Sequence, residues 1–242
     1  SIRRQRQMCI RDSPKADKVS LALLKFFTVL TSLGAKERLA LSFRHMKDDP
    51  QNHIRVIPPL LRREVTLHEP YSGDYIHGYM VNAGFSENVM KWHRQHPGIP
   101  LRFFWDKWEE EPVKRVDNTL SFYQLDDVEF LRQMAGCKAY ASTAGFESVC
   151  EAMYLGKPIL MVPAHIEQDC NAYDAEKSGA GIISSDFNLQ QLLEFAKDYH
   201  PNRDFVYWVR GAEYTLLNLL ESDSSNYQQV LFNEMYLVEE FI

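Results

Sequence analysis

Residues 142–172 of this chain read STAGFESVCEAMYLGKPILMVPAHIEQDCNA. The apolar residues 139–143 predict a short strand that runs into this segment, the Ala-Gly pair at 144–145 predicts a turn, and the next dozen residues have the spacing and composition of a helix. A Gly-Lys-Pro sequence at 156–158 ends that helix, and the apolar run 159–163 predicts a buried parallel strand. The segment therefore predicts a strand, turn, helix and strand of an α/β sheet.

The predicted turn has the chemistry of a phosphate site. Gly145 has no Cβ, so we expect the backbone to turn sharply there and to let a ligand come close. The first amides of the helix that follows have no partner within the helix, and the helix dipole adds positive potential at the same end. Both features suit a phosphate group.

A purely structural interpretation of the same residues is the alternative. Ser148 and Glu151 have the spacing of a capping box, in which the glutamate only satisfies a backbone amide, and Glu167-Gln168 could simply begin a helix. A ligand site is favoured because the polar positions recur in one register after two consecutive strands, and such sheets bind ligands at the carboxyl ends of strands. The positions are Gly145, Glu151, Pro158, Pro163, Glu167, Gln168, Asn171 and Ala172.

The ordered pattern is G-x-x-S-x-x-E, then G-x-P with a strand ending in proline, then E-Q-x-x-N-A. It resembles the donor-site signature of GT-B glycosyltransferases. The likeness is to the family-28-like enzymes related to the bacterial glycosyltransferase that makes lipid II and, more distantly, to the UDP-glycosyltransferases of plants and animals. It covers about residues 56–200. It implies an α/β fold with a doubly wound, Rossmann-like parallel sheet, the C-terminal half of a GT-B enzyme.

The resemblance also implies roles for individual residues. Glu151 matches the glutamate that holds the ribose hydroxyls of the donor, and Glu167-Gln168 match the pair that holds hydroxyls of the transferred sugar. The turn that holds the diphosphate corresponds to Thr143, Ala144, Gly145, Phe146 and Ser148.

Two positions around this site depart from the family pattern, and a third belongs to the expected sugar site. Thr143 stands where plant enzymes have a histidine, so phosphate contacts are expected from backbone amides and hydroxyls. Glu147 stands where they have an asparagine, which puts an anion beside the expected diphosphate or facing the acceptor. His165 is within reach of the transferred sugar, with a solvated loop histidine as the alternative.

Two further segments are assigned by their position along the chain. Tyr123 and Gln124 end a predicted strand where the family contacts the nucleotide base, largely through backbone groups. Asn82 and Gly84 lie in a loop where GT-B enzymes place a glycine-containing loop near the donor phosphates. One glycine is weak evidence, so an ordinary turn at 82–84 is the alternative there.

The resemblance implies a reaction. A hexosyl group moves from a nucleotide-diphospho-sugar, expected to be a UDP-sugar, to an acceptor hydroxyl, with inversion, while helix amides in place of a metal hold the charge of the leaving diphosphate. The general base is expected in a missing N-terminal domain, so we expect this chain to bind the donor and turn over nothing. A GT-B-fold UDP-sugar epimerase and a non-catalytic sugar-nucleotide-binding module are the alternatives. The acceptor, whether glycan, lipid or small molecule, is not indicated.

Residues 1–13 make the formal net charge of the chain less negative. Residues 3–13, RRQRQMCIRDS, resemble a translated transposase sequencing adapter, so we interpret residues 1–13 as an artefact, with a native basic tail as the alternative. Without the four arginines and one aspartate of this segment, the formal charge changes from −6 to about −9. An acidic chain does not favour a nucleic-acid partner.

The remaining residues point to no resident cofactor or metal. Cys137, Cys150 and Cys170 are odd in number and include no C-x-x-C, which indicates neither a disulfide framework nor a zinc site and fits a reducing cytoplasm. Asp126-Asp127 are interpreted as helix caps. No apolar run approaches the roughly 20 residues that span a bilayer. We expect a cytoplasmic location, with association at the inner face of the membrane left open.

The chain is expected to divide into four parts after the artefact. Residues 14–55 are interpreted as the truncated end of an acceptor-binding N-terminal domain, and residues 56–72, which begin with a stiff Val-Ile-Pro-Pro, as an interdomain linker. Residues 73–200 alternate strand and helix patterns and are assigned to the donor-binding domain, while 201–242 form a C-terminal helical segment. That alternation independently predicts a doubly wound parallel sheet.

Overall fold

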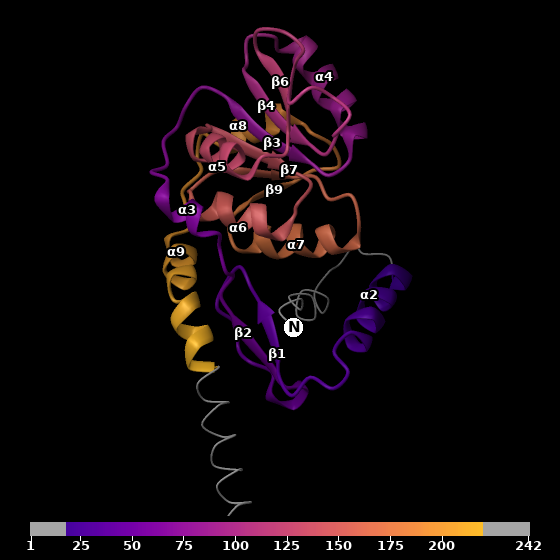
Figure 1. Ribbon diagram of the computed structural model, residues 1–242, viewed down its shortest axis with the longest axis vertical. Coiled ribbons are helices and arrows are strands. Elements are labelled where there is room, and N and C mark those ends of the chain that lie inside the picture. The colour runs from indigo at the N-terminus through magenta and orange to yellow at the C-terminus, as the bar shows by residue number, and fades with distance from the viewer. Residues whose placement is uncertain (1–17, 220–242) are drawn as a thin grey trace, which may run out of the picture.

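The computed structural model describes residues 18–219, and its main body is a seven-stranded sheet (Figure 1). The strands lie in the order β5, β6, β4, β3, β7, β8, β9, and all neighbours are parallel except β5 with β6. The chain runs outward from β3 through β4 to β6 and then places β7 on the other side of β3, so the strand order reverses between β3 and β7. The prediction of a doubly wound parallel sheet is confirmed. The strands are β3 Ile76–Met80, β4 Leu101–Trp105, β5 Val113–Arg115, β6 Leu120–Gln124, β7 Ala139–Ser142, β8 Ile159–Met161 and β9 Gly181–Ile183.

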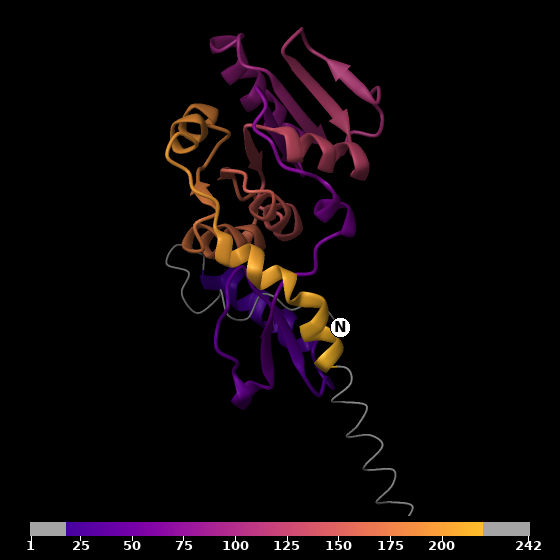
Figure 2. The same ribbon diagram turned by 90° about the vertical axis from the view of Figure 1, so that its left-hand side faces the viewer.

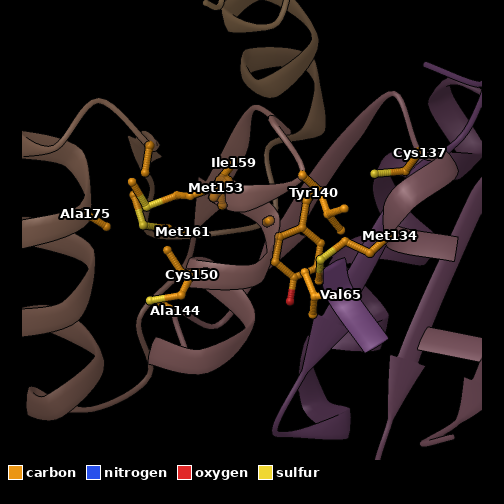
Figure 3. Packing of buried hydrophobic residues seen from close by; sticks show 14 of the residues in the cluster. Val65, Met134, Cys137, Tyr140, Ala144, Cys150, Met153, Ile159, Met161 and Ala175 are labelled. Carbon is orange, nitrogen blue, oxygen red and sulfur yellow. The ribbon is translucent and has the colours of Figure 1, made fainter. Parts of the chain in front are cut away.

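Helices cover both faces of this sheet. Strand alternation sends Tyr79 and Tyr140 toward one buried apolar cluster and Met80 and Ala139 toward another. Figure 3 shows part of the first cluster, to which Tyr140 and Val65 both belong. The first face carries α5 (Asp127–Gly136), α6 (Phe146–Tyr154), α7 (Ile166–Lys177) and α9 (Arg203–Arg210), and the second carries α4 (Ser86–Gln95), α8 (Leu189–Phe195) and the short η2 (Ala83–Phe85).

A smaller unit precedes the main sheet. It consists of α2 (Lys18–Leu30) and two parallel strands, β1 (Arg38–Leu41) and β2 (Ile54–Ile57), with a short η1 (Pro50–Asn52) between the strands. The sequence interpretation missed β2, because it placed a domain boundary within this strand, at residue 56, and interpreted the Val-Ile-Pro-Pro there as the start of a stiff linker. Burial of Ile54 and Val56, and a hydrogen bond from the Val56 amide to Asp48 Oδ1 at 2.8 Å, hold this strand beside β1.

The smaller unit packs against the helices of the first face, as the two views in Figures 1 and 2 show. Phe43, which is 1% exposed, lies with its ring centroid 4.5 Å from that of Phe146 at the start of α6. Arg44 Nη1 forms an ion pair with Asp174 Oδ1 of α7 at 2.8 Å, and Trp208 Nε1 of α9 donates to the Ser42 carbonyl at 3.0 Å. Three different helices therefore fix the segment that follows β1.

Residues 58–62 then lead to α3 (Arg63–Leu67) and on to β3. At the other end, the helical segment predicted from residue 201 contains a turn: α9 ends at Arg210, Gly211 forms the turn, and residues 212–219 are helical again. The predicted artefact, residues 1–13, and the last part of the predicted C-terminal segment, residues 220–242, lie outside the described residues. No helix within residues 18–219 is long and apolar enough to cross a membrane.

Candidate functional site

A cavity of about 370 Å³ opens at the point where the strand order reverses. Val81 follows β3 in its wall, and Gly145 follows β7, so the cavity lies at the carboxyl ends of two neighbouring strands, where ligands of such sheets bind. Its wall is completed by residues of the linker, α5 and α6. The lining residues are Arg62, Tyr79, Val81, Leu125, Asp127, Phe130, Gly145, Phe146, Glu147, Ser148 and Glu151.

The turn before α6 is built around Ala144, and the expectation that Gly145 supplies the sharp turn is wrong. Ala144 has φ +59°, in the left-handed region, whereas Gly145 has φ −63° and ψ 132°, which any residue can adopt. Ala144 is held there by the side chains of Ser142, whose Oγ accepts from its amide at 3.1 Å, and Asn171, whose Nδ2 donates to its carbonyl at 3.3 Å. Gly145 lines the cavity, and a Cβ there would have only Ser148 Oγ within 4 Å, at 3.5 Å.

Thr143 and Ala144 have no exposed surface, so their side chains face the protein. The Thr143 amide donates to the Tyr79 carbonyl at 3.3 Å, which joins β7 to β3 at the base of the cavity. The groups of the predicted phosphate turn that line the cavity belong to Gly145, Phe146 and Ser148. The first amides of any α-helix have no partner within the helix, so an anion role for those of α6 stays a prediction.

Glu151 is buried and paired with Arg62 of the linker. Arg62 Nε donates to Glu151 Oε1 at 2.6 Å and Nη2 donates to Oε2 at 2.8 Å, while the Glu151 side chain has 0% exposure. Burial raises the pKa of the Glu151 carboxyl, and the guanidinium opposes that rise. The same bond raises the pKa of Arg62 further above its already basic value. The capping-box alternative fails, because Gly145 is the N-cap of α6 and Ser148 Oγ donates to the Gly145 carbonyl at 3.2 Å.

Two more carboxylates stand around Arg62. Asp127 Oδ1 accepts from Arg62 Nη1 at 2.8 Å, and Glu147 Oε1 lies 4.0 Å from Arg62 Nε. Of the two aspartates expected to cap a helix, only Asp126 does so, by accepting from the Glu129 amide at 2.8 Å. Among the described residues that line the cavity, Arg62 is the single basic one. The sequence interpretation placed it in the linker and gave it no role.

Residues 7–199 match the sequence model of glycosyl transferase family 1. The chain belongs to this family. A curated relative, the putative UDP-glucuronosyltransferase ugt-48 of Caenorhabditis elegans, is 26% identical over 105 residues, which are 43% of this chain and 20% of that protein. The narrower likeness to family 28 is not confirmed by these matches.

Solved glycosyltransferase structures share the fold. The glycosyltransferase of kitacinnamycin superposes with a TM-score of 0.55 at 13% identity, over 88% of this chain and 64% of that one. The calicheamicin glycosyltransferase CalG4 gives 0.53 at 12% identity, over 85% and 61%. The part of this family 1 chain that superposes thus has the GT-B fold. The superposed part spans less than two thirds of the length of each of these two structures.

The residues expected to bind the transferred sugar lie at the start of α7, one strand away from the cavity. His165 is the exposed N-cap residue of this helix, and Glu167 follows in its first turn. Gln168 is buried, and its Oε1 accepts from the Ala164 amide at 2.8 Å, which orders the loop after β8. None of these three is among the residues that line the cavity as described. They stand beside it because β8 is the neighbour of β7.

The side chains of the residues expected near the base make other contacts in this family 1 chain, and the expected contacts through their backbone groups stay a prediction. Tyr123 stacks on Phe104 with ring centroids 5.1 Å apart, and Gln124 Nε2 donates to the Glu110 carbonyl at 2.6 Å. Their side chains therefore pack the sheet and fix a loop. Leu125, the next residue, lines the cavity, and the sequence interpretation did not single it out.

The loop after β3 is a capped turn. Asn82 Oδ1 accepts from the Gly84 amide at 2.8 Å and caps η2. Val81, the residue before Asn82, lines the cavity, whereas Asn82 and Gly84 are not among the lining residues. A phosphate role for these two residues stays a prediction. Within residues 18–219 no group of three or more His, Cys, Asp or Glu side chains is placed to hold a metal ion.

Proposed function

We propose that this family 1 chain contains the donor half of a glycosyltransferase that moves a hexosyl group from a nucleotide-diphospho-sugar to a hydroxyl, with inversion and without a metal. The observation that carries the proposal is the cavity at the strand-order reversal, bounded by the amino end of α6 and by Glu151. A UDP-sugar is the first donor to test, and the acceptor is open.

The chemistry of the cavity supports this function. The free amides at the start of α6 and the helix dipole would stabilise the charge that develops on a leaving diphosphate. Glu151 has two carboxylate oxygens that could accept from the two adjacent hydroxyls of a ribose once Arg62 no longer occupies them. Leu125 and Val81 add an apolar wall that suits the face of a base.

Transfer also requires a general base that removes the proton of the acceptor hydroxyl. Histidine is the residue that the resemblance implies for this task, and none of the described residues that line the cavity is a histidine. We therefore expect this chain to bind the donor without transferring its sugar.

Calorimetric titration of the chain with UDP, GDP and TDP, and with sugars attached to them, tests the proposal. We expect one of these series to bind, and Glu151→Ala to weaken binding about tenfold or more, the effect of losing charged hydrogen bonds to a ligand. Glu87→Ala, on the exposed side of α4, is the matched control and should leave affinity unchanged. If no nucleotide binds, or if Glu151→Ala and Gln168→Ala both bind as the native chain does, the assigned donor site is wrong.

A further inference from the structure

The linker residue Arg62 covers the glutamate that we expect to bind ribose. Its Nε and Nη2 hold both carboxylate oxygens of Glu151 at 2.6 and 2.8 Å, and no part of the Glu151 side chain is exposed. A planar guanidinium in this bidentate arrangement occupies the edge of the carboxylate that a vicinal diol would use. The hydroxyls of a ribose can therefore reach Glu151 only after the guanidinium has moved.

Two exposed carboxylates offer the guanidinium a second position. Asp127 already accepts from Arg62 Nη1 at 2.8 Å, and Glu147 lies 4.0 Å from Nε. Their side chains are 77% and 66% exposed, against 0% for Glu151. By rotating toward the solvent, Arg62 would keep these two anionic neighbours and leave the buried carboxylate free.

The backbone on either side of Arg62 is anchored, so the side chain is the part that can move. Leu61 packs against the buried cluster of the first face, and Val65 has no exposed surface. Arg62 itself is 26% exposed, which gives its long side chain a path out of the cavity. The transition thus needs only rotamer changes, which are fast in partly exposed side chains.

We propose that Arg62 occupies the ribose subsite in the free protein and leaves Glu151 when a nucleoside binds, so that this linker arginine sets the affinity for the donor. The inference rests on the proposed function. It differs from a merely structural ion pair in one respect: removing Arg62 strengthens binding of the ribose.

Uridine and guanosine are the probes, since they carry the ribose hydroxyls without phosphate. Arg62→Met keeps the length of the side chain and cannot donate, and we expect it to bind the preferred nucleoside about tenfold more tightly than the native chain. The gain should be smaller for the 2′-deoxynucleoside, which has one of the two hydroxyls. Arg62→Lys, which cannot span both oxygens, should give an intermediate affinity. Arg63→Met, at the exposed neighbouring position, should change nothing.

Each outcome separates this inference from the proposed function. If the native chain binds UDP or GDP and folded Arg62→Met binds the nucleoside no better, Arg62 does not obstruct the subsite and the donor site stands. If neither protein binds any nucleotide or nucleoside, the proposed function fails. Since Arg62→Met leaves a buried carboxylate without its partner, thermal unfolding is measured for every variant. If Arg62→Met does not fold, Arg62→Lys decides, and an affinity no higher than the native one contradicts the inference.

Discussion

His77 lies at the centre of the sheet, on β3, with no exposed surface. Its ring stacks on Tyr140 at 5.3 Å and meets Phe104 and Phe130 edge-on, and no described residue forms a hydrogen bond with either ring nitrogen. Burial lowers the pKa of His77 from its usual 6.5 to about 3. In the folded protein this imidazole is therefore neutral well above pH 3.

This burial predicts a loss of stability in weak acid. Between pH 6.5 and about 3 the unfolded chain binds a proton at His77 that the folded chain does not, so acid favours unfolding in that window and has no effect through this group above it. From pH 7 to pH 5 the loss amounts to about 2 kcal/mol of unfolding free energy. Urea unfolding at both values should show that His77→Leu loses about 2 kcal/mol less than the native chain. Equal losses in the two proteins would rule out this account.

The positions of some residues at the candidate site could be predicted from the sequence, and those of others could not. Glu151 could be predicted because its spacing from Gly145 along one helix fixes its place relative to the turn. Arg62 could not, because it is 89 residues away and reaches Glu151 only through the path of the linker. Tyr123 and Gln124 were placed at the right strand end, but the direction in which their side chains point depends on Phe104 and on the loop up to Glu110.

Among the elements, the unit formed by β7, the turn and α6 carries the site. Ala144 adopts a left-handed conformation that costs an alanine about 1–2 kcal/mol, and Ser142 and Asn171 hold it there. Gly145, by contrast, has ordinary dihedral angles, and a Cβ there would meet only Ser148 Oγ, at 3.5 Å. The fold therefore favours a small residue at 144, and we expect the proposed donor to use the open space at 145.

This division of roles predicts opposite effects at adjacent positions. Gly145→Ala should change the unfolding free energy by less than about 1 kcal/mol and weaken nucleotide binding, because Gly145 lines the cavity and an added methyl group takes up space there. Ala144→Val should lower the unfolding free energy by about 2 kcal/mol or more, since a β-branched residue is strained at this φ and the site is fully buried. Denaturant unfolding and calorimetry on the two variants measure both effects. A severe loss of stability in Gly145→Ala would contradict this account, because it would show that the turn requires glycine at position 145.

The sequence interpretation missed β2 and β5, two strands that depend on pairing with a neighbouring strand. β5 has three exposed residues, and only its antiparallel pairing with β6 makes it a strand. β2 likewise depends on β1, from Arg38 opposite Ile54 to Leu41 opposite Ile57. Two buried parallel strands, β7 and β8, and the helix α6 between them agree with the sequence interpretation within a few residues, because their apolar patterns are strong.

At the scale of the whole molecule, the two units of the described part differ in how well their apolar side chains are buried. Helices cover the main sheet, whereas α2 of the smaller unit has exposed apolar side chains. The exposed side chains of α2 include Leu23, Phe26, Phe27 and Leu30, all more than half exposed. Grouped apolar side chains of this kind mark an association surface, unlike isolated ones.

This surface predicts self-association at high protein concentration. Replacing Leu23, Phe26 and Leu30 together by glutamine should shift the protein toward monomer in sedimentation velocity, without lowering the melting temperature by more than a few degrees, because exposed side chains contribute little to folding. Val116→Gln, which removes a single exposed apolar side chain elsewhere, is the control and should leave the sedimentation profile unchanged. A native chain that stays monomeric at all concentrations would show that α2 is not such a surface.

The most direct test of the donor site is a crystal structure of the chain with UDP. We predict the diphosphate against the amides of residues 145–148, the ribose hydroxyls on Glu151, and the guanidinium of Arg62 turned toward Asp127. A nucleotide bound away from the amino end of α6, with the Arg62–Glu151 pair intact, would contradict the central claim that this cavity is the donor site of a glycosyltransferase.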